Sequence, residues 1–212
     1  HVLETALLQI EAWQREGLSV IVSVNISANH LLHRSFVPQL AALLARHPKV
    51  APQQLELEVL ESAAMNDLGR AIDVMTRCKM LGVHFALDDF GTGYSSLAYF
   101  RRLPVDVLKI DQSFVRDMLQ DDEDLAIVES VVRLAQVFGR ATIAEGVETL
   151  EHAARLIDLG CSIAQGHGIA MPMPANQLLP WLEQWRSQAI WKQTSRWQQA
   201  ARHPKTSQGN LF

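Results

Sequence analysis

Short apolar segments alternate with amphipathic helical segments along this chain, and this alternation limits the folds open to it. Apolar runs typical of strands cover residues 20–24, 55–61, 83–88, 105–110, 141–144 and 162–164. Helical patterns lie around them at 1–16, 35–47, 67–81, 122–138, 149–159 and 178–197. Strands and helices in alternation predict a parallel sheet with crossover helices. We therefore expect an α/β fold and, within that class, a (β/α) barrel.

A polar side chain stands at the C-terminal end of each predicted strand. In chain order these residues are Asn25, Glu58, Asp88 with Asp89, Lys109, Glu145 and Gln165. In a (β/α) barrel the C-terminal ends of the strands open onto the face that carries the active site. Solvated loop residues would not recur so regularly at strand ends, so we expect these side chains to form one polar site.

The adjacent carboxylates Asp88 and Asp89 are the most informative pair in this set. Two like charges in contact do not both stay ionised unless a positive partner is close. A divalent cation is the simplest such partner, and Mg2+ and Mn2+ prefer carboxylate oxygens. The pair suggests two ions, with Asp88 bridging them and Asp89 serving the second. The alternative is a strand that ends in two solvated aspartates.

Lys109 and Glu145 are the candidates for catalysis at such a site. Two cations about 3.5–4 Å apart suit in-line displacement at phosphorus. Among carboxylates Lys109 would stay charged, and it could orient a water or stabilise charge on phosphate oxygens. Its alternative role is a structural ion pair with Asp111 or Asp88. Glu145 could hold the second cation or accept a proton.

Several nearby residues have a supporting role or a purely structural one. Glu61 is the last residue of its predicted strand, three residues past Glu58, and we expect it to hold the loop 91–93 through backbone amides. Glu148 and Thr149 are candidates for the site, but they could equally cap the helix that follows. His167 lies just past Gln165 and could line the mouth of the site.

Composition excludes some other classes of function. A net charge of -4 argues against a broad nucleic-acid-binding face, which needs clustered Lys and Arg. Cys78 and Cys161 lie far apart in apolar surroundings, so we expect buried free thiols and a cytoplasmic location. No apolar run approaches the ~18 residues that a membrane helix needs.

The specific motifs of the chain are the stretches 24–27, 55–62, 86–97, 105–114, 144–149 and 165–167, and the third contains the block DDFGTGYSSL. On these residues the chain closely resembles the EAL domain, the bacterial cyclic di-GMP phosphodiesterase. The family fold is a TIM-type barrel with one strand reversed. The resemblance implies hydrolysis of cyclic di-GMP to linear pGpG with two Mg2+ or Mn2+ ions. It also implies a homodimer through the loop after Asp89 and neighbouring helices.

The resemblance also implies a role for each matching residue. The implied metal ligands are Asn25, Glu58, Asp88, Asp89 and Glu145, with Asp88 shared. Lys109 and Glu145 would position or activate the attacking water. The implied supporting residues are Glu61, Asp111, Glu148 and Gln165, and Glu61 would hold the loop after Asp89. The implied substrate-binding residues are Gly91, Gln165 and His167.

The sequence departs from the family pattern in ways that affect these expectations. The glutamate of the EAL tripeptide and a nearby substrate-contacting arginine are absent, so we expect an incomplete barrel with about six strands and weak or no activity in this piece. Leu60, His167 and Met171 stand where the family often has Thr, Tyr and a basic residue. We expect residues 1–186 to form the EAL domain and 187–212 to add a helix extension and a polar tail. Regulatory domains usually precede this module, and upstream segments could anchor the parent protein to a membrane.

Two functions from different classes follow from these observations. The first is a two-metal cyclic di-GMP phosphodiesterase, which the set from Asn25 to Gln165 favours. The second is a non-catalytic cyclic di-GMP sensor or protein-docking module, which the absent glutamate favours. An unrelated metal-dependent barrel lyase would leave the DDFGTGYSSL block unexplained.

Overall fold

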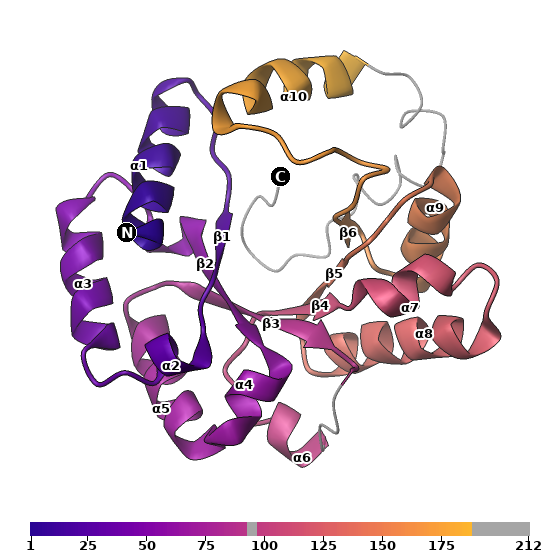
Figure 1. Cartoon of the computed structure of the whole chain (residues 1–212), viewed down its shortest axis with the longest axis horizontal. Helices are drawn as coiled ribbons and strands as arrows, with labels where there is room; N and C mark the ends of the chain where they lie inside the picture. Colours follow the sequence, from indigo (N-terminus) through magenta and orange to yellow (C-terminus); the bar gives the residue numbers. More distant parts are fainter. Residues whose placement is uncertain (93–96, 188–212) are drawn as a thin grey trace. The chain divides into compact units, whose positions relative to one another are not determined.

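The structure is a computed structural model that describes residues 1–92 and 97–187. Its strands follow one another in the order β1-β2-β3-β4-β5-β6, each hydrogen-bonded to the next. The described residues form two compact units. Figure 1 labels the helices and strands of both. The first comprises His1–Lys109 and Val137–Ala141, and the second comprises Ile110–Gln136 and residues 142–187.

The first unit contains the strands β1 (Val22–Asn25), β2 (Leu55–Leu60), β3 (His84–Phe90) and most of β4 (Val107–Ile110). β1 pairs with β2 and β2 with β3, both in parallel, as the alternation of strands and helices predicts. Its helices are α1 (Val2–Arg15), α2 (Ala28–Leu31), α3 (Phe36–Arg46), α4 (Glu61–Asn66), α5 (Leu68–Met80), α6 (Leu97–Phe100) and the 3-10 turn η1 (Pro52–Gln54).

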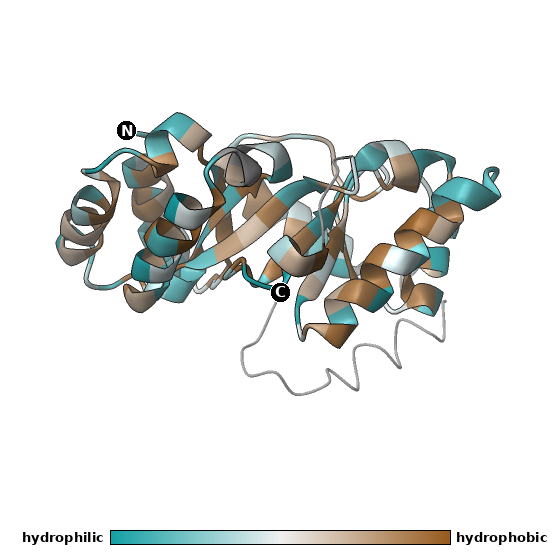
Figure 2. Cartoon of the chain, turned by 90° about the horizontal axis from the view of Figure 1, so that it is seen from below, coloured by the Kyte–Doolittle hydropathy of each residue, from teal (hydrophilic) through white to brown (hydrophobic). Residues whose placement is uncertain are grey.

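Burial of β2 and β3 on both faces forms the core of this unit. Five of the six residues of β2 are buried, and Leu55, Leu57 and Val59 are fully enclosed. Strands covered on both faces are typical of parallel sheets flanked by helices. The helices carry hydrophobic residues along one side and hydrophilic residues along another, as amphipathic packing requires (Figure 2). The strand ends are therefore held on a rigid support.

The second unit contains α7 (Gln112–Asp117), α8 (Asp122–Val137), β5 (Ala141–Ala144), α9 (Leu150–Leu159), β6 (Ile163–Ala164), the turn η2 (Ala175–Gln177) and α10 (Leu178–Ser187). β5 pairs with β6 in parallel. The helix α9 begins at its cap Thr149, whose hydroxyl accepts a hydrogen bond from the His152 N–H, and it ends at Gly160 with φ 96°. A left-handed glycine is the common end of a helix, because it lacks the Cβ that strains this conformation.

Two sequence expectations about elements need correction. The apolar pattern predicts residue 61 within a strand, but β2 ends at Leu60 and Glu61 begins the short helix α4. The short helices α2, α6 and α7 are not predicted, because four to six residues carry too little periodicity to indicate a helix. The expected tail 187–212 lies outside the described residues except for Ser187, the last residue of α10.

Candidate active site

The register of the first three strands brings the predicted residues of the first unit to one edge. Asn25 pairs with Glu58 across β1 and β2. Glu58 pairs with Ala86 across β2 and β3, and Asp88 lies two residues further along β3. Side chains two residues apart on a strand share a face, so Asn25, Glu58 and Asp88 project on the same side of the sheet. Glu58 and Asp88 are buried, whereas Asn25 is exposed.

Lys109 joins two of these carboxylates from the neighbouring strand β4. Its Nζ donates a hydrogen bond to Glu58 Oε2 at 2.9 Å. The same nitrogen lies 2.9 Å from Asp88 Oδ1. A charge removed from water is stable only when it is closely paired, and Lys109 is only 4% exposed. The predicted position of this lysine among carboxylates is therefore present in the structure.

The acidic set of the first unit fits a divalent cation. Asp88 Oδ1 is buried and, although it lies close to Lys109, it forms no hydrogen bond within the described residues. Carboxylate oxygens of Asp88 and Asp89 lie within 4.8 Å of one another. Together, the three carboxylates of Glu58, Asp88 and Asp89 and the ammonium of Lys109 carry a net charge of −2. A buried oxygen without a hydrogen bond, beside such charge, suits the hard oxygen coordination of Mg2+ or Mn2+.

Asp89 has an unusual backbone conformation that fixes where its side chain points. Its φ is 55°, and it is the only non-glycine residue with positive φ among the described residues. Such a conformation costs about 1–3 kcal/mol and persists only where the surroundings enforce it. Glu61 Oε2 accepts a hydrogen bond from the Gly91 N–H at 3.1 Å, two residues further on. This is the backbone contact that the sequence led us to expect of Glu61.

Glu56 is a polar residue of this region that sequence reasoning did not single out. It is 4% exposed, and its Oε1 accepts a hydrogen bond from the Ser23 hydroxyl at 2.7 Å. Burial raises the pKa of the Glu56 carboxyl, and the negative charge of Glu58 adds to this effect. The sequence signal that could have identified Glu56 is its position two residues before Glu58, which places both residues on one face of β2.

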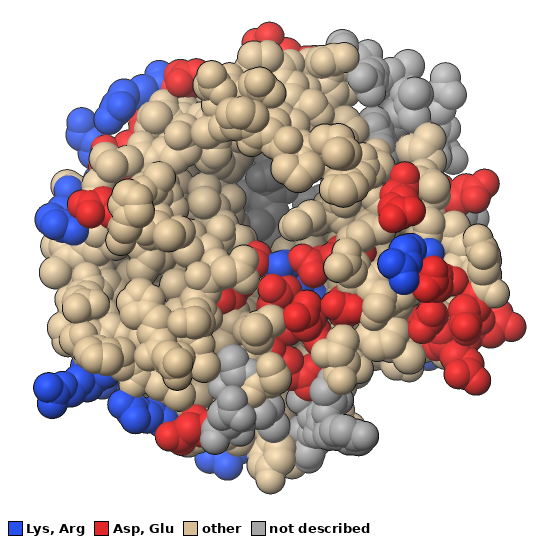
Figure 3. Space-filling view, viewed as in Figure 1, with Lys and Arg blue, Asp and Glu red and all other residues tan. Residues whose placement is uncertain are grey.

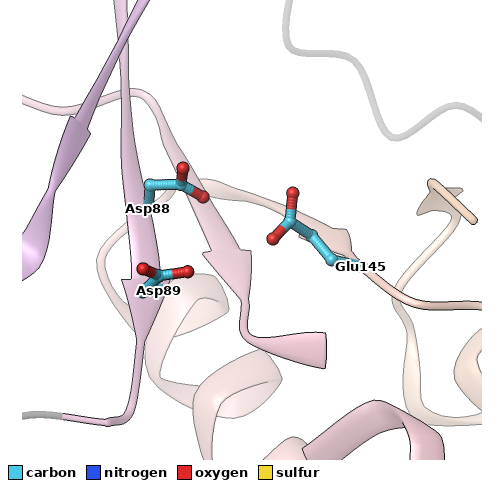
Figure 4. A group of neighbouring side chains, drawn as sticks. All are labelled: Asp88, Asp89 and Glu145. Atoms are coloured by element: carbon cyan, nitrogen blue, oxygen red, sulfur yellow. The ribbon is translucent and has the colours of Figure 1, made fainter. Parts of the chain in front are cut away.

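In the second unit, backbone hydrogen bonds between residues 144–147 and Gln165 position Glu145 and Gln165. The Gln165 N–H donates to Ala144 O at 2.8 Å, and the Val147 N–H donates to Gln165 O at 3.0 Å. A Cβ on Gly166 would lie 2.2 Å from Val147 O, so only glycine permits this approach. Glu145 follows β5 directly and is half-buried, while Asp88 and Asp89 project from β3 (Figure 4).

Of the other predicted residues of the second unit, Asp111 and Thr149 have local structural roles. Asp111 caps α7, because its Oδ1 accepts a hydrogen bond from the Ser113 N–H at 2.8 Å. Thr149, rather than Glu148, provides the side-chain cap of α9. Glu148 and His167 are exposed. Whether the residues of the second unit act together with those of the first stays a prediction.

A separate group of carboxylates at the start of α8 has a structural explanation. Acidic side chains gather over α7 and the start of α8 (Figure 3). Asp121 Oδ1 accepts hydrogen bonds from the N–H groups of Glu123 and Asp124, and three acidic residues occupy the first turn of α8. Negative charge at a helix N-terminus is stabilised by the helix dipole. This group therefore needs no bound ion to account for it.

Comparison with known proteins identifies the family. The EAL domain family matches residues 1–172. MucR of Pseudomonas aeruginosa, a bifunctional diguanylate cyclase and cyclic di-GMP phosphodiesterase, is 40% identical over 84% of this chain and 26% of its own length. The cyclic di-GMP phosphodiesterase PA2567 of the same organism is 36% identical over 85% of this chain and 31% of its own. The chain thus spans about a quarter to a third of these relatives. It belongs to the EAL domain family.

Solved structures agree with this assignment. The phosphodiesterase PaMucR in complex with cyclic di-GMP matches with a TM-score of 0.80 and 40% identity, over 84% of this chain and 72% of that one. The EAL domain of Mycobacterium smegmatis DcpA matches with a TM-score of 0.81 and 35% identity, over 86% of this chain and 82% of that one. The fold is therefore the TIM-like barrel of EAL domains in incomplete form, with six strands in the part of the chain that the structure describes. None of the helices in the described part of the chain has the length and apolar character needed to span a bilayer.

Proposed function

We propose that this chain is the catalytic domain of a cyclic di-GMP phosphodiesterase, which opens the cyclic dinucleotide to linear pGpG. The observation that carries the proposal is the buried group of Glu58, Asp88 and Lys109 at the ends of neighbouring strands. Two findings on related proteins support it: homologues named as cyclic di-GMP phosphodiesterases, and a similar fold in complex with that dinucleotide.

We assign the metal site to residues of the two units on the basis of the family motifs. Asn25, Glu58, Asp88 and Asp89 of the first unit and Glu145 of the second would hold two ions, Mg2+ or Mn2+. Bound there, the ions would polarise the phosphoryl oxygens and make a water more acidic. The excess negative charge around Asp88 supports this assignment, because it needs a positive counterpart.

The protein's own side chains would then orient and deprotonate the water. The Lys109 ammonium is paired with two buried carboxylates, and it can donate a hydrogen bond to the water or to a phosphoryl oxygen. Glu145 would accept a proton from the water as its oxygen bonds to phosphorus. The P–O3′ bond breaks, and the released 3′ oxygen takes up a proton.

The remaining residues would support the metal ligands or contact the dinucleotide. Glu61 would hold the loop after Asp89, and Asp111 and Glu148 would support the site from the second unit. Gly91, Gln165 and His167 would contact the substrate. A homodimer through the loop after Asp89 and a cytoplasmic location, expected from the two buried free thiols, complete the proposal.

The test is hydrolysis by the full-length protein that carries these residues. Cyclic di-GMP with Mn2+ should yield pGpG, separated by chromatography, and Asp88→Ala should abolish the product. The matched control is Asp73→Ala, which removes an exposed aspartate paired with Arg77 on α5. Binding of cyclic di-GMP without turnover would support the sensor function instead. Undiminished turnover by Asp88→Ala would refute the assignment of the site.

A further inference from the structure

The guanidinium of Arg140 holds the short helix α6, which follows the DDFG segment in the chain. Its Nη2 donates hydrogen bonds to the carbonyl oxygens of Phe100 and Leu103, at 3.0 and 2.7 Å. Phe100 is the last residue of α6, and Leu103 lies just beyond it. Both carbonyls belong to the first unit, as does Arg140. One side chain therefore fixes the C-terminal end of α6.

Aromatic contacts extend this arrangement to β3. The guanidinium carbon of Arg140 lies 4.0 Å from the centre of the Phe100 ring, and Phe138 meets the same ring edge to face at 5.3 Å. On β3, Phe90 packs against Phe100 with ring centres 5.2 Å apart. A cation over an aromatic face is attracted by the ring, so Arg140 also fixes the orientation of Phe100.

Phe90 is the residue directly after Asp89, which has the strained backbone described above. Glu61 fixes this segment by binding the Gly91 N–H, on the other side of Phe90. We propose that Arg140 is a positioning residue for Asp89, acting through Phe100 and Phe90. This inference deepens the proposed function and rests on it, because Asp89 matters there as a ligand for the second cation.

The environment of Arg140 argues for a role beyond filling space. Its Nη1 is buried and has no hydrogen-bond partner among the described residues. Burial lowers the pKa of Arg140, because removing the guanidinium from water carries a cost. A long apolar side chain would pack over Phe100 without that cost. An apolar residue could not donate the two hydrogen bonds that Nη2 makes to the carbonyl oxygens of Phe100 and Leu103.

The test compares Arg140→Met with Lys79→Met in the full-length protein. Methionine keeps an unbranched, flexible side chain, although a shorter one, and removes the charge and the hydrogen bonds. Lys79 is a matched control, since it is another partly buried cation of the first unit and pairs with Asp106 rather than with α6. Two readouts need no substrate: amide hydrogen exchange at Gly91 and Thr92 without metal, and the affinity for Mn2+ alone.

We expect exchange at Gly91 and Thr92 to become about tenfold faster in Arg140→Met, the scale of a lost charged hydrogen bond, and Mn2+ to bind about tenfold more weakly. Lys79→Met should change neither by more than about twofold. Faster exchange confined to residues 100–103 would overturn the inference, as would equal effects in Lys79→Met. If the wild-type protein binds no Mn2+, the proposed metal site fails, and the exchange at Gly91 still decides whether Arg140 positions this segment.

A second variant keeps the test decisive should Arg140→Met fail to fold. Arg140→Lys retains the charge but lacks the planar guanidinium, which lies over the Phe100 ring while its Nη2 reaches both carbonyls. The rate of amide exchange at Gly91 should then be higher than in the wild-type protein, but by less than tenfold. Exchange at Gly91 identical to the wild-type protein would overturn the inference.

Discussion

Lys109 donates a hydrogen bond to Glu58 at 2.9 Å while both residues are more than nine-tenths buried. Asp88 shares the same ammonium, so one cation serves two buried carboxylates. Removing one partner of a buried ion pair leaves the other charge uncompensated, which is more costly than losing an exposed pair. This makes Lys109 important to the stability of the metal-free protein as well as to the proposed chemistry.

The first prediction concerns Lys109→Met. Without the ammonium, repulsion and burial of the two carboxylates should lower the free energy of unfolding by about 3–5 kcal/mol in metal-free buffer. Mn2+ should restore part of this loss, because it supplies positive charge to the same oxygens. Thermal melting with and without Mn2+ measures both effects. Turnover should fall about 100-fold or more, as when one donor to a developing negative charge is removed.

The control for this substitution is Lys49→Met, which removes an exposed lysine. It should melt close to the wild-type temperature and gain no extra stability from Mn2+. The prediction is wrong if Lys109→Met gains no more stability from Mn2+ than the wild-type protein does.

The second prediction concerns the hydrogen bond from Gly91 to Glu61. Glu61→Gln keeps the shape of the side chain but removes the charge, which should weaken this bond by about 1 kcal/mol. Because Asp89 lies two residues before Gly91, the Mn2+ concentration for half-maximal turnover should rise about fivefold. Glu11→Gln, at a carboxylate that pairs with His47 on a different part of the first unit, should leave that concentration unchanged. Equal values for both variants would show that Glu61 does not support the metal site.

Much of the first unit follows from the sequence because strand ends are marked by polar residues after apolar runs. Asn25, Glu58, Asp88 and Lys109 each lie at or near the C-terminal end of a predicted strand, and the structure brings the last three into contact. The parallel pairing of β1, β2 and β3 also follows from the alternation of elements. Period-two strands and period-3.6 helices leave strong patterns, so these features could be predicted.

Other features could not be predicted, because they depend on contacts between distant segments. Arg140 and Phe100 are forty residues apart, and no local pattern indicates that they touch. The positive φ of Asp89 is equally hidden, since aspartate is not the residue that usually marks this conformation. The place of Glu61 at the start of a six-residue helix likewise left no periodic signal.

The third prediction concerns the close backbone approach of Gly166 to Val147 in the second unit. In Gly166→Ala the new Cβ would lie 2.2 Å from Val147 O, so the backbone must shift. Forced displacement in a packed region costs about 1–3 kcal/mol. Gly69→Ala is the matched control, because Gly69 is inside α5 and the methyl group of an alanine there would meet nothing within 4 Å. That change should stabilise the protein by about 0.5–1 kcal/mol. Chemical denaturation of both variants gives the comparison, and a neutral Gly166→Ala would contradict the close approach.

The fourth prediction follows from the buried carboxyl of Glu56. Burial raises its pKa in the folded state above the ordinary value of 4.5. Between these two pKa values the folded protein holds a proton that the unfolded chain releases. The contribution of Glu56 to stability is therefore complete below pH 4.5 and is lost as the pH rises through the folded-state pKa. At neutral pH the buried carboxyl opposes folding.

Glu56→Gln removes this ionisation and retains an oxygen for the Ser23 hydroxyl, which lies 2.7 Å from the carboxylate. We expect the variant to be about 1 kcal/mol more stable than the wild-type protein at about pH 7, and equal to it at about pH 4. Urea denaturation of the metal-free protein across this range measures the difference. Glu16→Gln, at an exposed glutamate after α1, should have the same stability as the wild-type protein at both pH values. A difference between Glu56→Gln and the wild-type protein that does not change with pH would mean that Glu56 is ionised alike in the folded and unfolded states.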